Sequence, residues 1–314
     1  MDAPQSPRFS PVLVLFFGVL GISSGSILVR FSQGEGVPSL VIAAWRLSFA
    51  TLILLPLAFG KKREEIASLS LADWRLAVLS GLMLAVHFAS WISSLAFTSV
   101  ASSTVLVTTS PLWVGLAAPL LLGEKLTRPL RAGIFLALVG SVLIGLGDVM
   151  AVVDGRLLFS LTQFTSQPDP LLGNGLAIIG AIAAAFYLII GRRLRQKLSL
   201  LSYITVVYGS AAIFLLLIAL GSGHHLFGYS LAAYGFMLLM AVMPQLIGHS
   251  SYNWALGYLP AAYVSIAVIA EPIGATMLAV IFFQEIPGIF TLIGSAFILL
   301  GVVIASKRNG EKIE

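Results

Sequence analysis

The stretch from Ser110 to Thr127 reads SPLWVGLAAPLLLGEKLT, and a shift of 161 positions places it on EPIGATMLAVIFFQEIPG, residues 271–288. Both segments start with a polar residue and a proline, continue through an apolar run and reach a glutamate at the same position, Glu124 or Glu285. The match extends outward to the pairs Gly133 with Gly294 and Gly140 with Gly301. The second half of the chain is therefore predicted to repeat the first.

The composition indicates an integral membrane protein. The chain has 314 residues, 58% hydrophobic and 10% charged, whereas a soluble domain carries about 25% charged residues. The apolar runs are about 20 residues long, the length of a helix that crosses a bilayer. Strands of a membrane barrel would alternate over roughly ten residues instead. We therefore expect helical spans.

The apolar runs predict an all-α membrane protein with ten transmembrane helices. The expected spans are 11–29, 38–59, 74–97, 100–122, 129–148, 173–191, 200–220, 232–257, 260–283 and 287–306. Five spans in each copy make two inverted repeats, because a repeat with an odd number of spans enters the membrane the opposite way the second time. The predicted domains are a first repeat at 11–148, a linker at 149–172, a second repeat at 173–306 and a cytoplasmic tail at 307–314. Inverted repeats are typical of secondary transporters, with the substrate site between the halves.

Lysine and arginine set the predicted orientation, because cytoplasmic loops carry an excess of both. With the N-terminus in the cytoplasm, all of the 18 basic residues except Arg30, Arg46 and Arg156 fall in cytoplasmic segments. The opposite orientation would invert this bias. We expect both termini in the cytoplasm and the chain in the cytoplasmic (inner) membrane.

Several kinds of chemistry find no support in the sequence. The net charge of +5 comes from basic residues in short loops, which does not predict nucleic-acid binding. The chain has no cysteine, no phosphate-binding loop and no HExxH zinc motif. We therefore expect no metal, no cofactor and no enzymatic activity.

Glu271 is a candidate binding residue because a charge within the hydrocarbon is costly and is often functional. It precedes Pro272, as Ser110 precedes Pro111. Each proline removes a backbone donor, so both spans should loosen there and could act as hinges. Two interpretations of Glu271 stay open: it binds a substrate amine or a proton, or it only packs helices. Arg46 allows two as well: a clamp for a substrate carboxylate, or a side chain that reaches the outer interface or binds helix-end carbonyls.

Two polar stripes predict the walls of a central cavity. His87, Trp91 and Ser94 share one face of the third span, and Gln245, His249 and Asn253 follow at intervals of four in the eighth. The predicted substrate-binding residues are His87, Trp91, Ser110, Trp113, Tyr187, His249, Tyr252, Asn253 and Glu271. The alternative is that the stripes only pack one helix on another.

The chain resembles the drug/metabolite transporter superfamily, in particular its ten-helix EamA-type exporters. The likeness covers residues 11–306 and rests on LLLGEKLT at 120–127 with Gly133 and Gly140, repeated as FFQE at 282–285 with Gly294 and Gly301. Gln284 stands where the first copy has Gly123. The resemblance implies two inverted five-helix bundles around a cavity that faces each side of the membrane in turn.

The leading functional hypothesis is a carrier that exports small metabolites, most simply amino acids or similar zwitterions. Members of the resembled family move amino acids, nucleotides, other metabolites or drugs. A drug, cation or nucleotide-type carrier is therefore the alternative of the same fold. A polytopic membrane enzyme and a non-transporting subunit are weaker alternatives. The sequence leaves proton coupling and oligomeric state open.

Overall fold

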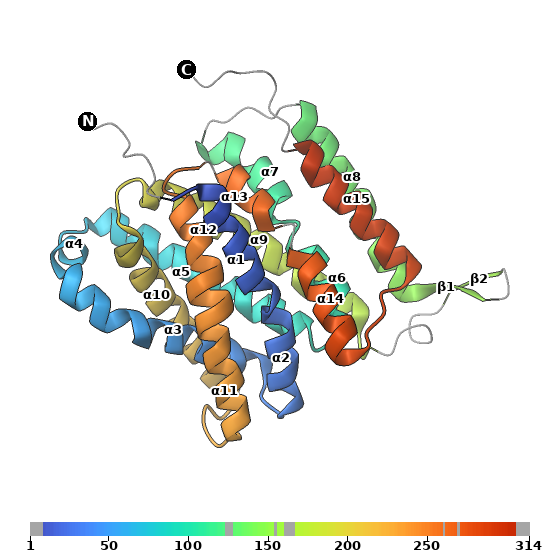
Figure 1. Ribbon diagram of the computed structural model, residues 1–314, viewed down its shortest axis with the longest axis horizontal. Coiled ribbons are helices and arrows are strands. Elements are labelled where there is room, and N and C mark those ends of the chain that lie inside the picture. The colour runs from blue at the N-terminus through green and yellow to red at the C-terminus, as the bar shows by residue number, and fades with distance from the viewer. Residues whose placement is uncertain are drawn as a thin grey trace.

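The computed structural model describes residues 9–122, 128–153, 156–159, 167–259, 261–268 and 271–305. Long helices lie side by side in a bundle, and one further helix pair lies along its edge (Figure 1). Glu124 and the predicted tail at 307–314 lie outside the described residues.

The helices follow the predicted spans to within a few residues. The first half contains α1 (Pro11–Ser23), α2 (Gly25–Gly34), α3 (Ser39–Lys61), α4 (Arg63–Ala67), α5 (Leu71–Ser94), α6 (Val100–Val107), α7 (Ser110–Leu122) and α8 (Arg128–Val149). The second half contains α9 (Pro170–Arg195), α10 (Leu200–Gly221), α11 (Leu231–Met240), the π-helix η1 (Ala241–His249), α12 (Ser250–Ala255), α13 (Ala261–Ala267), α14 (Glu271–Phe283) and α15 (Ile289–Ala305).

A short hairpin joins the halves. Strand β1 (Met150–Val153) pairs antiparallel with β2 (Arg156–Phe159), so that Met150 lies opposite Phe159. This hairpin falls in the stretch that the sequence assigns to a linker. The remaining described elements are helices, which confirms the all-α class apart from this one feature.

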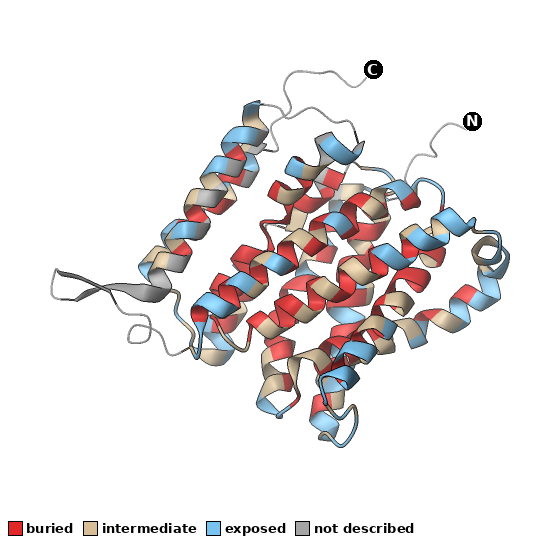
Figure 2. Cartoon of the chain, turned by 180° about the vertical axis from the view of Figure 1, so that it is seen from behind, coloured by how far each residue is buried: buried red, intermediate tan, exposed pale blue. Residues whose placement is uncertain are grey.

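Seven segments are long and apolar enough to cross a membrane among the described residues. They are Leu13–Gly34, Ser39–Lys61, Leu71–Ser94, Val100–Ala117, Pro170–Arg195, Leu200–Gly221 and Leu231–Ala255, with shorter apolar helices at Glu271–Phe283 and Ile289–Gly301. Large apolar side chains such as Leu120 and Leu231, both 88% exposed, face outward. Figure 2 shows buried residues between the helices and exposed ones around the outside. An apolar exterior of this kind suits a lipid environment, and the chain spans the membrane several times.

Several spans are interrupted where they face the interior. The span at Leu13–Gly34 breaks at Ser24, whose hydroxyl donates to the carbonyl of Gly21 over 2.8 Å. Pro244 lies inside η1 and has no N–H to donate, and the backbone there takes the wider π form that often occurs at functional sites. The eighth span is therefore not the regular α-helix that the sequence predicted.

The helices α8 and α15 touch through bare backbone and lie side by side (Figure 1). A Cβ on Gly140 would overlap the carbonyl oxygen of Gly294, and a Cβ on Gly294 would overlap that of Gly140. Gly140 also faces Ile298, and Gly294 faces Ile144. Later residues of α8 thus meet earlier residues of α15, so the two helices run antiparallel. Small residues permit such a close approach in membranes.

Candidate central cavity

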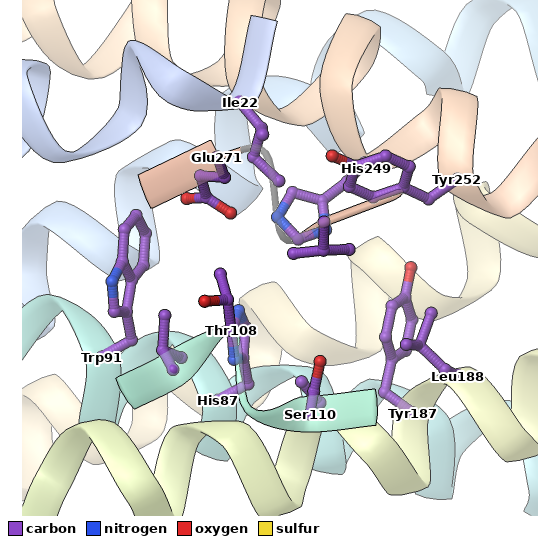
Figure 3. A pocket seen from close by; sticks show the side chains of 13 residues that line it. Ile22, His87, Trp91, Thr108, Ser110, Tyr187, Leu188, His249, Tyr252 and Glu271 are labelled. Carbon is purple, nitrogen blue, oxygen red and sulfur yellow. The ribbon is translucent and has the colours of Figure 1, made fainter. Parts of the chain in front are cut away.

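A narrow cavity lies between the two halves of the chain (Figure 3). Its lining comes from both halves: Ile22, His87, Trp91, Val107, Thr108 and Ser110 from the first, and Ala184, Tyr187, Leu188, His249, Tyr252, Val268 and Glu271 from the second. The space open to the centre of a water molecule is about 40 Å³. One water needs about 10–15 Å³ on this measure, so the cavity in this conformation holds only a few.

The structure brings most of the predicted site residues together. The cavity lining includes His87, Trp91, Ser110, Tyr187, His249, Tyr252 and Glu271. Arg46, Trp113 and Asn253 are not part of this lining. Pro111 and Pro272 are the second residues of α7 and α14, so each directly follows a residue of the cavity wall.

Glu271 is the acid of this cavity. It is 4% exposed, and its carboxylate points into the open space between the helices (Figure 3). As the first residue of α14 it lies at a helix N-terminus, where the helix dipole favours negative charge. The hydroxyl of Ser23 reaches the carbonyl oxygen of Glu271 over 3.5 Å. The carboxylate itself makes no hydrogen bond to a described residue, so it is free to bind a ligand or a proton.

Two histidines and a tryptophan also line this cavity. The His87 and His249 rings lie 6.0 Å apart between centroids, and His87 stacks nearly parallel to Trp91 at 6.1 Å. Nδ1 of His87 lies 3.0 Å from the carbonyl oxygen of Gly180. Because a carbonyl only accepts, Nδ1 carries the proton. In the neutral ring, Nε2 is then an acceptor.

Asn253 supports the cavity from behind. Its Oδ1 accepts from the hydroxyl of Tyr187 over 2.7 Å, and its Nδ2 donates to the hydroxyl of Tyr208 over 3.0 Å. The Tyr208 hydroxyl also lies 3.2 Å from that of Ser250. The polar stripe therefore divides into His249, which lines the cavity, and Asn253, which orients the cavity residue Tyr187.

Arg46 is fully buried on α3, and its position rules out the predicted reach to the outer interface. Its Nε donates to Oε1 of Gln245 over 2.9 Å, and the guanidinium carbon lies 4.1 Å from the Phe88 ring centroid. Arg46 interacts electrostatically with Glu271, but the ion pairs between described residues, with N and O within 4.0 Å, do not include these two. Gln245 belonged to the predicted stripe, whereas the contact with Phe88 left no signal in the sequence.

Trp113 turns to its own helix break instead of the cavity. Its Nε1 donates to Oγ1 of Thr109 over 3.3 Å. The hydroxyls of Thr108 and Thr109 donate in turn to the carbonyls of Val105 and Leu106, over 3.0 and 2.7 Å. Hydroxyl groups thus satisfy carbonyls at the end of α6, where the helix stops short of Pro111.

A second polar cluster ties α2, α6 and the end of α14 together. Oε1 of Glu285 accepts from the backbone N–H of Val100 over 2.6 Å, and its Oε2 lies 3.7 Å from Nη2 of Arg30. The same Nη2 donates to the carbonyl of Thr98 over 2.8 Å. Glu285 therefore caps a helix of the other half, whereas its repeat partner Glu124 lies outside the described residues.

The described residues contain no group of three or more His, Cys, Asp or Glu side chains that could hold a metal ion. The expectation that the protein needs no metal or cofactor stays a prediction. The arrangement offers an acid, imidazoles, tyrosine hydroxyls and aromatic faces, which suit reversible binding of a small polar molecule.

The two halves of the chain each match the same protein family. The model of the EamA-like transporter family matches residues 9–146 and again 171–307. These two matches cover most of the chain and coincide with the two copies detected by the shift.

The similar curated proteins are also transporters, and their names give no substrate. An uncharacterized transporter of Archaeoglobus fulgidus is 25% identical over 217 residues, 69% of this chain and 70% of its own. The uncharacterized transporters YetK and YyaM of Bacillus subtilis are 24% and 23% identical over 91% and 89% of this chain, and 83% and 88% of their own. One solved crystal structure has a TM-score of 0.65 at 19% identity, covering 96% of this chain and 97% of that one, and shows the fold alone.

Proposed function

Since the chain belongs to the EamA-like transporter family, we propose that it exports amino acids or similar zwitterionic metabolites across the cytoplasmic membrane by alternating access. The family makes it a membrane transporter and not an enzyme. The observation that carries the proposal is the cavity between the halves, with Glu271 aimed into it and His87, Trp91 and Tyr252 around it.

Two inverted five-helix repeats, at 11–148 and 173–306, are part of the proposal. The antiparallel crossing of α8 and α15 supports it, because these helices occupy equivalent places in the two copies. Equivalent helices run in opposite directions only if one copy is inverted. A site between inverted halves near the middle of the membrane is the common plan of secondary transporters.

The proposed orientation, with both termini in the cytoplasm, gains support from one end of the bundle. The basic loop after α3 and the basic loop after α9 lie together there: the N–H of Ser199 donates to Oε1 of Glu65 over 2.6 Å, and Lys197 pairs with Asp73 at 3.2 Å. Burial alone would raise the pKa of Glu65, but hydrogen bonds from Ser199 and Lys62 outweigh it and lower the pKa. Basic loops gathered at one end fit the cytoplasmic side.

In the proposed cycle one half rocks against the other. The Arg30–Glu285 cluster joins the halves at one end of the molecule, and its opening would let the cavity widen toward that side. Pro111 and Pro272 lie where α7 and α14 begin beside the cavity, so we place the hinges there. A widened cavity is required, because the present space admits only a few waters.

A zwitterion fits the chemistry of the wall. Glu271 offers a negative charge to an ammonium group, and the face of Trp91 attracts cations as well. A proton is the second proposed ligand of Glu271. The same groups support the alternative substrate class, cationic drugs, which need no partner for a carboxylate.

Counterflow in proteoliposomes tests the proposal. Purified protein is assayed with labelled amino acids, nucleosides and cationic drugs, with and without a pH gradient. We expect saturable counterflow of amino acids. Saturable counterflow confined to cationic drugs or nucleosides would reject the zwitterion and retain the carrier, whereas non-saturable leak of every probe would reject the carrier.

Trp91→Ala tests whether this cavity is the binding site. The change removes an aromatic wall and should impair counterflow without lowering the amount of protein in the membrane. Ser48→Ala is the matched control, because Ser48 lies on the other side of α3, in an apolar groove against α10. Normal transport by Trp91→Ala would place the binding site elsewhere.

A further inference from the structure

Two neighbouring side chains beside the cavity, Arg46 and Trp91, carry three buried N–H-bearing nitrogens without an acceptor among the described residues. Nη1 and Nη2 of Arg46 and Nε1 of Trp91 are buried and donate no hydrogen bond to any described residue. The two side chains are neighbours, because the guanidinium carbon of Arg46 is 5.9 Å from the centroid of the Trp91 ring. Nε2 of Gln245, whose Oε1 accepts from Arg46, is also buried without a partner. Buried donors without partners are costly, so several on neighbouring side chains indicate that a ligand supplies the acceptors.

The positive charge of Arg46 indicates that the ligand that supplies these acceptors is negatively charged. A buried guanidinium is stable only with a negative charge and hydrogen bonds close by. Glu271 lies within electrostatic range, but does not bond to the guanidinium, and Gln245 occupies only Nε. The two free nitrogens form the outer edge of a planar fork, the shape that pairs with the two oxygens of a carboxylate.

The position of Trp91 connects this place to the cavity. Its ring forms part of the cavity wall and also lies near Arg46. Phe88 covers one face of the guanidinium at 4.1 Å, and Gln245 holds Nε, so the fork has a fixed orientation. A carboxylate carried by a molecule in the widened cavity could reach it past the Trp91 edge, while Glu271 takes the other end of that molecule.

We propose that Arg46 and Trp91 form a subsite for the carboxylate of the transported solute, with Gln245 as the positioning residue. This inference rests on the proposed function and narrows it to molecules that carry a carboxylate and an ammonium group. A cationic drug would leave the Arg46 fork unpaired and would add a second positive charge to the buried site.

The first test compares a labelled amino acid with its decarboxylated amine as competitors in counterflow. In the wild type the amine should compete about 10- to 100-fold less well, the value of a charge-assisted pair. Arg46→Lys keeps the charge but loses the fork, and should bring the two competitors close to equality. Trp91→Phe keeps a ring and removes one N–H, and should reduce the preference by a smaller factor.

A control variant and the contrary outcomes allow the carboxylate subsite to be rejected without rejecting the carrier. Ser48→Ala removes an unpartnered buried hydroxyl of α3 that faces away from Arg46, and should leave the preference unchanged. Equal competition by acid and amine in the wild type, or an unchanged preference in both Arg46→Lys and Trp91→Phe, would overturn the subsite while counterflow itself upholds the carrier.

A binding measurement tests the subsite even without a transported amino acid. Purified protein is unfolded by heat in sodium acetate or sodium chloride at equal ionic strength. We expect acetate to raise the midpoint in the wild type and not in Arg46→Lys. An equal rise with chloride would identify a resident inorganic anion and overturn the carboxylate, and no rise with either salt would overturn the subsite.

Discussion

The two copies of the repeat share a backbone plan and differ in polarity. On one buried helix face, the shift of 161 positions pairs each polar residue of the second copy with an apolar residue of the first. The pairs are Gln245 with Leu84, His249 with Phe88 and Asn253 with Ile92. The broken spans show the same contrast in polarity, because the charged Glu271 is the repeat equivalent of the uncharged Ser110. Among the residues that line the cavity, the second copy therefore supplies most of the ionisable groups, while the first contributes packing surface and the neighbouring face with His87 and Trp91.

The breaks themselves show how the difference arises. In the first copy the hydroxyls of Thr108 and Thr109 satisfy the carbonyls at the end of α6. The equivalent positions of the second copy are Ile269 and Ala270, which have no hydroxyl. A break whose carbonyls are bonded by its own hydroxyls suits a structural role, and an acid directly after a break suits a binding role.

The largest effect is expected at the acid. Glu271→Gln should abolish the dependence of transport on a pH gradient and leave substrate exchange measurable, because the amide cannot take up a proton. Ser110→Ala, the same position in the first copy, should keep the dependence. Uptake into proteoliposomes with and without a gradient decides the matter, and unchanged pH dependence in Glu271→Gln would exclude it as a coupling site.

The prolines come next. Alanine restores a backbone donor and lets the break close into a continuous helix. Pro272→Ala should slow counterflow about tenfold, a rise of ~1.4 kcal/mol in the barrier, and Pro111→Ala should slow it less. Initial rates at saturating substrate measure both. Equal slowing in the two variants would mean that both breaks contribute equally to the motion. The two copies would then differ in polarity but not in their hinges.

Substitutions of buried residues should lower the free energy of unfolding more in the polar second copy than in the first. Asn253→Ala leaves the hydroxyls of Tyr187 and Tyr208 without this partner, at a cost of about 1–3 kcal/mol. The matched change in the first copy, Ile92→Val, should cost about 0.5–1.5 kcal/mol. Thermal unfolding in detergent compares them, and a smaller loss in Asn253→Ala would show that the network does not stabilise the fold.

The smallest effect is expected at the closed break. Thr109→Val removes the hydroxyl that donates to Leu106 and accepts from Trp113, and should cost about 1 kcal/mol. Thr51→Val is the control, because the Thr51 hydroxyl donates to the carbonyl of Leu47 within the unbroken helix α3. Equal losses in the two variants, measured as before, would mean that the break needs no hydroxyl.

Sequence patterns predicted the features that repeat or have a period. The shift found the two copies, hydropathy found the helices to within a few residues, and proline marked the breaks at Pro111 and Pro272. His87 and Trp91 share a helix face by simple spacing and do line the cavity. These predictions succeed because each depends on neighbours along the chain.

The misplaced residues depend on other helices. The indole of Trp113 bonds within its own break, Asn253 bonds two tyrosines from α9 and α10, and Arg46 finds Gln245 on η1. Helical spacing gives a face but not the helix that the face meets. The π form of η1 also shifts the register of the eighth span, so equal intervals of four no longer point one way.

The contact between Gly140 and Gly294 fixes the distance between α8 and α15, which can serve as a reference in distance measurements. Neither helix can move closer at this point, since bare backbone already meets bare backbone. The chain has no cysteine, so thiol labels placed on α8 and α15 would carry no background. A pair of labels on these two helices should read one fixed separation in every conformation, and any pair across the cavity can be calibrated against it.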